Sequence, residues 1–305
     1  IDGVGYAFNG PYAVLSFATP VGVNEVSMTV AAQSIGNFTA GTAISRKYTV
    51  AIPVGTYSNG TLQLQYEDAE LNGNTENALK FYNYDNALLK WRSYGRTNQN
   101  STQNWISKAG LASLSGEWTL SSSPGTYSWV GGNNAAWENA ANWQDITEGV
   151  PGMAASAPLS TDIAILGEVN PSNHPVINSA ATVSNLQFRG TAGNNLTISS
   201  GSLHVLGNLA ASGAGTAIVH NLTTGNNNLI VGGNLVLNDG STGNSISLVN
   251  GAGSISVTGN IEQPAGASVA LGSGNLSLGG NYNYTTGAAF IAGTGTVTYN
   301  GTANQ

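Results

Sequence analysis

A repeated pattern in the last third of the chain constrains the fold more than any other feature. Four segments of eleven residues align without gaps, and each has alternating apolar residues around a Gly-Asn pair. They are SLHVLGNLAAS (202–212), NLIVGGNLVLN (228–238), SISVTGNIEQP (254–264) and NLSLGGNYNYT (275–285). A fifth, TVTYNGTANQ (296–305), keeps the apolar pair but reverses Gly-Asn to Asn-Gly. Successive segments begin 26, 26, 21 and 21 residues apart.

The alternation within these segments predicts short strands with one buried face. We expect a further strand before each segment, as in NLTIS (195–199), SISLV (245–249) and SVAL (268–271). Units of this length that each supply two or three strands are typical of the coils of a β-solenoid, which bury their apolar faces by stacking. The aligned apolar positions are Leu203, Val205 and Leu209, then Leu229, Val231 and Leu235, then Ile255, Val257 and Ile261, then Leu276, Leu278 and Tyr282.

The Gly-Asn pair has a structural interpretation in a solenoid. The glycines predict corners with positive φ, which residues without a Cβ adopt readily. The asparagines at the next position would stack along the solenoid as a ladder of side-chain amides. A repeated ligand site is the alternative interpretation. The pairs are Gly207-Asn208, Gly233-Asn234, Gly259-Asn260 and Gly280-Asn281.

The rest of the chain also predicts strands, so the expected fold class is all-β, an N-terminal β-sandwich followed by a β-helix or solenoid-like repeat domain. Residues 1–123 contain short alternating runs separated by turn residues, which is typical of an Ig-like or jelly-roll sandwich. Residues 124–182 are rich in Pro and Trp and predict a linker and cap, and residues 183–305 form the repeat domain. The sandwich runs are AVLSFA (13–18), EVSMTV (25–30), KYTVAIPV (47–54), TLQLQY (61–66), LKFYNY (79–84) and ALLKWRSY (87–94).

The composition limits the partners of the chain. Charged residues make up only 8% of it and the formal net charge is −7, so we expect no nucleic-acid partner and no attraction to anionic membranes. No apolar run is long enough to span a bilayer, and there is no cysteine. The start at Ile1 predicts a mature or trimmed segment of a longer precursor. The weakly charged chain, rich in Gly and Asn, predicts an extracellular protein.

Two sets of motifs resemble large secreted and cell-surface proteins of the Bacteroidota. In the first unit, RKYTVAIPVG (46–55) precedes YEDAELNG (66–73), and EWTLSS (117–122) closes the unit. In the second, the motifs are W-x-G, W, NW, VP, D-x-x-I and P-x-I, followed by rungs and a closing G-T-V-x-Y-N-G-x-x-x-Q. These positions are Trp129, Gly131, Trp137, Asn142, Trp143, Val150, Pro151, Asp162, Ile165, Pro175 and Ile177, then Gly295, Thr296, Val297, Tyr299, Asn300, Gly301 and Gln305. The resemblance implies an exported bacterial protein, extracellular or at the cell surface. It would be a gliding-associated protein, an adhesin or an extracellular filament, exported by the type IX route.

The residues that could do chemistry are scattered, so we expect no enzyme and no cofactor. His174, His204 and His220 are far apart and lack the spacing of a metal site. The oxygen-bearing side chains of Asp68, Glu70, Asn72 and Asn74 make this segment a weak candidate for a calcium site. A polar turn that satisfies main-chain amides is the alternative for this segment.

Eight Asn-x-Ser/Thr sequons make glycans possible modifications or partners. About seven are expected by chance in so Asn-rich a chain, so their number carries no argument by itself. The candidate asparagines are Asn37, Asn59, Asn100, Asn195, Asn221, Asn275, Asn283 and Asn300.

Three of the six tryptophans, Trp129, Trp137 and Trp143, lie within fifteen residues. They predict an apolar cap on the first coil of the solenoid, joined to the sandwich. The alternative is an exposed aromatic platform that stacks on sugar rings.

These features together predict a non-enzymatic structural subunit of an extracellular bacterial filament. Copies would join head-to-tail by β-strand addition through residues 1–20 and 290–305, because the closing motif ends at Gln305, where the family pattern runs on into another strand. A surface adhesin or a carbohydrate-binding module of a larger secreted protein is the alternative. A fragment of a secreted hydrolase is a third, disfavoured by the lack of an acid/base pair.

Overall fold

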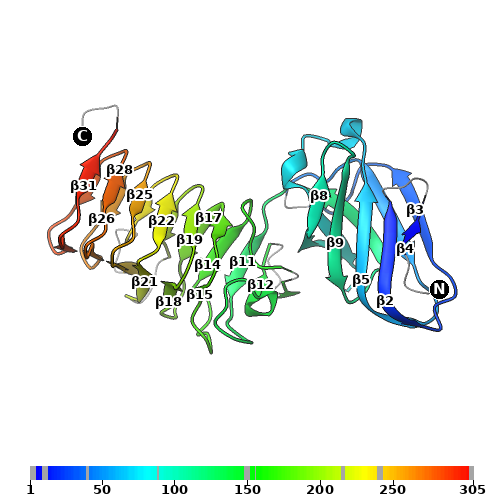
Figure 1. Cartoon of the computed structure of the whole chain (residues 1–305), viewed down its shortest axis with the longest axis horizontal. Helices are drawn as coiled ribbons and strands as arrows, with labels where there is room; N and C mark the ends of the chain where they lie inside the picture. Colours follow the sequence, from blue (N-terminus) through cyan, green and yellow to red (C-terminus); the bar gives the residue numbers. More distant parts are fainter. Residues whose placement is uncertain are drawn as a thin grey trace. The chain divides into compact units, whose positions relative to one another are not determined.

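The computed structural model divides the chain into two compact units, Ile1–Pro124 and Gly125–Gln305 (Figure 1). It describes residues 5–8, 13–38, 41–87, 89–147, 152–154, 156–213, 217–238 and 243–301. The only helical elements in these ranges are three single 3-10 turns, η1 (Asp68–Glu70), η2 (Glu76–Ala78) and η3 (Ala140–Asn142). The prediction of an all-β protein is therefore confirmed. The motif positions Val150, Pro151 and Gln305 lie outside the described residues, as do parts of the segments 1–20 and 290–305.

The first unit consists of two antiparallel five-stranded sheets. One sheet has the order β1 (Tyr6–Ala7), β2 (Val14–Val21), β5 (Thr56–Gln65), β9 (Trp105–Leu111), β8 (Asn98–Asn100). The other has the order β3 (Ser27–Ala32), β4 (Arg46–Ala51), β10 (Gly116–Ser121), β6 (Lys80–Asp85), β7 (Lys90–Gly95).

Both sheets contribute to one apolar core. Alternate residues of β5, Leu62 and Leu64, are fully buried, and they belong to the same cluster as Tyr48 of β4 and Trp118 and Leu120 of β10. Period-two burial on facing sheets defines a sandwich. The predicted N-terminal β-sandwich is thus confirmed.

The second unit winds into a β-solenoid whose coils contribute six parallel strands to each of three stacks, and three further strands extend the first stack to a nine-stranded sheet. The first stack is β14 (Ile163–Leu166), β17 (Asn185–Phe188), β20 (Leu209–Ala211), β23 (Leu235–Val236), β26 (Ile261–Gln263) and β29 (Tyr282–Tyr284). The second is β15 (Val176–Ile177), β18 (Asn195–Ile198), β21 (Val219–Gly225), β24 (Ser245–Asn250), β27 (Ser268–Ala270) and β30 (Ala289–Ile291). The third is β16 (Ala181–Val183), β19 (Ser202–Val205), β22 (Asn228–Val231), β25 (Ile255–Val257), β28 (Leu276–Leu278) and β31 (Val297–Tyr299). One strand from each stack makes a coil.

The register of the stacked strands confirms the repeat alignment. Leu203 pairs with Leu229, which pairs with Ile255, then Leu276, then Val297. These are the positions that the 26- and 21-residue offsets place in one column. The inward residues of the first five coils are almost all buried and form one continuous cluster. Stacking therefore supplies the core that no single coil could form.

The prediction of positive φ at the repeated glycines is wrong. None of Gly207, Gly233, Gly259 and Gly280 has a positive φ. These positions need glycine because the neighbouring coil leaves no space for a Cβ atom. A Cβ added to Gly259 would lie 2.3 Å from the side-chain oxygen of Asn234 and 2.7 Å from the carbonyl oxygen of Gly233. The neighbouring coil approaches Gly259 so closely that a side chain at this position would overlap it.

Residues 124–182, expected to be a separate linker and cap, belong almost entirely to the second unit. β11 (Thr126–Trp129) pairs in parallel with β14, and β12 (Trp143–Asp145) and β13 (Gly152–Met153) extend the same sheet in antiparallel fashion. The tryptophans share one core cluster with the coils. The solenoid unit therefore begins at Gly125.

Candidate functional site

The three clustered tryptophans are buried, with exposed fractions of 0% for Trp129, 2% for Trp137 and 1% for Trp143. Trp143 lies between the other two, with ring centroids 5.1 Å from Trp129 and 4.6 Å from Trp137, both edge-to-face. A sugar platform needs exposed and roughly coplanar rings. The sugar-platform interpretation is therefore wrong, and the rings close the first end of the solenoid core.

A polar frame holds this cap in place. Buried Asn142 accepts hydrogen bonds from the amides of Asn133 and Asn134 and donates to the Ala136 carbonyl. The indole of Trp143 donates to the Trp137 carbonyl at 2.8 Å. Asn142 and Trp143 of the N-W motif thus provide hydrogen-bond partners for main-chain groups of the loop next to the rings.

Two carboxylates in the same region are also structural. Asp162, fully buried, accepts from the amides of Gly125 and Leu159, both at 2.8 Å. Glu138 accepts from the amides of Asn178 and Ser179. Burial opposes ionisation of Glu138, but these hydrogen bonds outweigh it and lower its pKa.

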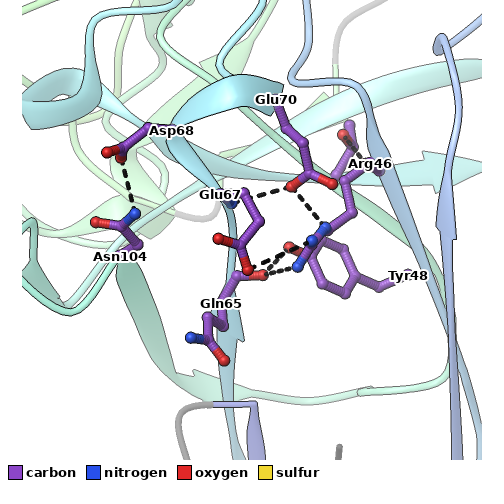
Figure 2. A network of polar contacts seen from close by, with 8 residues as sticks. Arg46, Tyr48, Gln65, Glu67, Asp68, Glu70 and Asn104 are labelled. Atoms are coloured by element: carbon purple, nitrogen blue, oxygen red, sulfur yellow. Dashed lines mark hydrogen bonds and ion pairs between the residues drawn. The ribbon is translucent and has the colours of Figure 1, made fainter. Parts of the chain in front are cut away.

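In the sandwich, the first two segments of the motif set in the first unit, RKYTVAIPVG and YEDAELNG, meet in one polar network (Figure 2). The guanidinium of Arg46 contacts the Glu70 carboxylate at 2.7 Å and donates to the Gln65 carbonyl at 2.9 Å. The hydroxyl of Tyr48 donates to the same carbonyl. Burial raises the pKa of the Tyr48 hydroxyl, so it stays protonated as a donor. The network ties β4 to the turn at Glu67 to Glu70.

The side chains of the suggested calcium site are all engaged in contacts within the sandwich. Asp68 accepts from the side chain of Asn104 at 2.7 Å, and Asn72 donates to the Ala43 carbonyl (Figure 2 shows the first of these). Asn74 accepts from the Ser122 amide at 2.7 Å. No cluster of three or more His, Cys, Asp or Glu suited to a metal occurs in the described ranges. The geometry favours the polar turn.

All sequon asparagines except half-buried Asn100 are exposed, but several use the amide nitrogen to which a glycan would attach. Asn221 donates to Asn195 of the neighbouring coil at 2.6 Å, and Asn283 donates to Glu262 at 2.8 Å. Asn100 and Asn300 also donate, to Gln103 and Ser277. Glycosylation stays a prediction, and at Asn195 and Asn221 two glycans would have to share neighbouring strands. The Thr residues of the sequons at Asn37 and Asn300 lie outside the described ranges.

The repeated asparagines form a ladder along one corner of the solenoid. Each side-chain oxygen accepts a hydrogen bond from the main-chain amide of the asparagine in the next coil. The amides of Asn234 and Asn260 donate to Asn208 and Asn234 at 2.8 Å, and the amide of Asn281 donates to Asn260 at 2.9 Å. The ladder is thus side chain to main chain rather than amide to amide. It begins one coil earlier, at Asn185. Sequence reasoning missed this residue because Ser184 replaces the glycine before it.

Replacing Asn234 with alanine should remove the acceptor for the Asn260 amide at a half-buried corner. We expect the free energy of unfolding of the solenoid to fall by about 1–2 kcal/mol. Asn221→Ala is the control, since it removes only an exposed contact between side chains, and it should cost about 0.5 kcal/mol or less. Urea unfolding measures both, and equal losses would refute the role of the ladder.

A buried histidine lies inside the solenoid. His220 of β21 is fully buried; its Nδ1 accepts from the Asn194 amide and its Nε2 lies 3.1 Å from the Asn244 side-chain oxygen. An Nδ1 that accepts a main-chain hydrogen bond belongs to a neutral ring. Burial lowers the pKa of His220.

The lowered pKa of His220 predicts a pH-dependent stability. Below about pH 6.5 the unfolded chain binds a proton that the folded chain resists, so the free energy of unfolding should decline as the pH falls. Urea unfolding at several pH values should show a smaller decline for His220→Gln than for the unmodified chain. An unaltered decline in His220→Gln would contradict the assignment.

Within the described residues, nothing covers the last coil, unlike the first. Its inward positions hold Tyr282, Tyr284, Phe290, Val297 and Tyr299, which line an apolar hollow of about 480 Å³. Tyr284 is 54% exposed, Phe290 37% and Tyr299 53%. No strand in the described part of the chain pairs with the outer edges of β29, β30 and β31. This end combines exposed aromatic side chains with free main-chain hydrogen-bonding groups.

A change in chemistry marks this end, and the sequence contains the signal. The residues paired one coil earlier with Tyr282, Phe290 and Tyr299 are Ile261, Val269 and Leu278, all aliphatic. Tyrosine rings with polar tips suit a surface that is half-buried and half-wet. The alignment of the repeats shows this change from aliphatic to aromatic residues. Only the structure shows that the aligned positions face the interior of the solenoid, and therefore that the change marks its uncovered end.

No protein-family model matches the chain, and neither a curated protein nor a solved structure shows significant similarity to it. In the described ranges, no helix has the length and hydrophobicity needed to cross a membrane.

Proposed function

We propose that the protein is a structural subunit of an extracellular filament at a bacterial surface, with copies joined by β-strand addition at the open last coil. The observation that supports this is the contrast between the two ends of the solenoid. Three tryptophans seal the first coil, whereas the last coil exposes aromatic side chains and three strand edges. Unpaired, uncharged edges of this kind are sites of strand addition.

The proposal assigns no catalytic step to the chain. The carboxylates of Glu70, Glu138 and Asp162 are engaged in contacts that hold turns. The low charge, 8% of residues, limits electrostatic repulsion between copies and suits close assembly.

The test compares two lysine substitutions in the same outward row of one stack. Val249, Ala270 and Ile291 are paired in successive coils, with Val249 42% and Ile291 65% exposed. Ile291→Lys places a charge on the open edge and should abolish assembly. Val249→Lys, in an interior coil, should leave it intact.

Electron microscopy and light scattering of the full chain give the readout. Elongated assemblies in the unmodified chain and in Val249→Lys, with monomers in Ile291→Lys, are the expected result. A monodisperse monomer that binds glycans would instead favour the adhesin or carbohydrate-binding alternative, with a site other than the buried tryptophans.

A further inference from the structure

The sandwich has four outer strands, and three of them are protected against strand addition. β1 has two residues and β8 has three. β7 carries Lys90 and Arg92. Short edges and positive charges are the usual devices that prevent pairing with another chain.

The part of β2 beyond β1 is also protected. Its pairing with β5 is interrupted by two register shifts, between Ser16 and Ala18 and between Ala18 and Val21. Thr19 has a φ of 43°, and Pro20 has no amide to donate. Bulges and proline both disfavour the addition of a strand here. Residues 14–20 are therefore a poor joining element.

β3 has none of these protections. It has six residues, SMTVAA, without charge or proline, and it pairs with β4 at every position without a bulge. No other strand in the described part of the chain lies along its outer edge. Val30 is 38% exposed, and Met28 is half-buried against the core. β3 is therefore a regular, uncharged edge.

The last coil is the matching edge. β29, β30 and β31 also lack charged residues, and β30 is the apolar triplet Ala289–Ile291. From the geometry and the absence of charge on both sides, we infer that β3 of one copy pairs with the last coil of a second copy. This inference rests on the proposed function and names its joining strand, which replaces residues 1–20 in that role.

The chain has no cysteine, so single cysteines give a direct test on the full protein. A Thr29→Cys copy and an Ile291→Cys copy, carrying tags of different size, are mixed and oxidised. The mixed disulfide dimer should form in high yield. Asn98→Cys, on the edge of β8, replaces Thr29→Cys in the control and should give at least about tenfold less mixed dimer, equivalent to about 1.4 kcal/mol.

A second variant separates this inference from the proposed function. Val30→Lys gives β3 the protection that β7 has, and it should raise the concentration needed for assembly about tenfold or more. Asn98→Lys should not, and circular dichroism should show that both variants are folded. If Ile291→Lys blocks assembly but Val30→Lys does not, β3 is not the joining strand and the proposed function stands. If the unmodified chain does not assemble, both fail.

Discussion

Replacing Trp143 with alanine should lower the free energy of unfolding of the solenoid unit by about 3–5 kcal/mol. The ring is 1% exposed and lies between two other indoles. Its removal would leave a cavity and would also release the hydrogen bond to the Trp137 carbonyl. Denaturant unfolding followed by circular dichroism measures the loss, and hydrogen exchange should localise it to β11, β12 and β14.

Trp105→Ala is the matched control. Trp105, on β9 of the sandwich, is half-buried, and its indole donates only to the side chain of Gln103. We expect a loss of about 1 kcal/mol or less, without faster exchange in the solenoid. Equal losses in the two variants would mean that the tryptophan cluster is not the cap of the solenoid.

Replacing Gly259 with alanine should cost about 2–3 kcal/mol, although only one methyl group is added. The new Cβ would overlap the Asn234 side-chain oxygen and the Gly233 carbonyl. The neighbouring coils would have to separate, which weakens the ladder bond from the Asn260 amide to Asn234. Thermal unfolding of the full chain provides the measurement.

Gly36→Ala is the control for this substitution. An added Cβ at Gly36 meets no atom within 4 Å, and Gly36 has no positive φ. The free energy of unfolding of this variant should lie within about 0.5 kcal/mol of that of the unmodified chain. If Gly259→Ala were as stable as the unmodified chain, the coils would have room for a Cβ at this corner, contrary to the structure.

Features set by local periodicity were predictable from the sequence. The alternation of Leu203 and Val205 predicts which face of β19 is buried, and the offset of 26 residues predicts its register with β22. β21 was harder to recognise because its buried His220 interrupts the apolar alternation that marks the other strands.

Features that depend on a neighbouring coil were not predictable in the same way. A glycine can be required because its φ is positive or because a neighbouring chain segment comes too close for a Cβ. For Gly259 the second reason holds, and it depends on the position of the adjacent coil, which the sequence does not give. That residues 125–182 belong to the solenoid unit, and are not a separate linker and cap, depends on the parallel pairing of β11 with β14, which is distant in sequence. The open end needed the structure as well, since exposure of Tyr284 and Tyr299 depends on what covers the last coil.

The central claim is that copies join at the last coil, and hydrogen exchange of the full chain tests it most directly. As protein concentration rises into the range where assemblies form, the amides of β30, the strand that contains Ile291, should become protected because the joining strand pairs with its free edge. The amides of β19 and β22, already paired on both sides, should not change. Elongated assemblies with unchanged exchange at β30 would contradict the account.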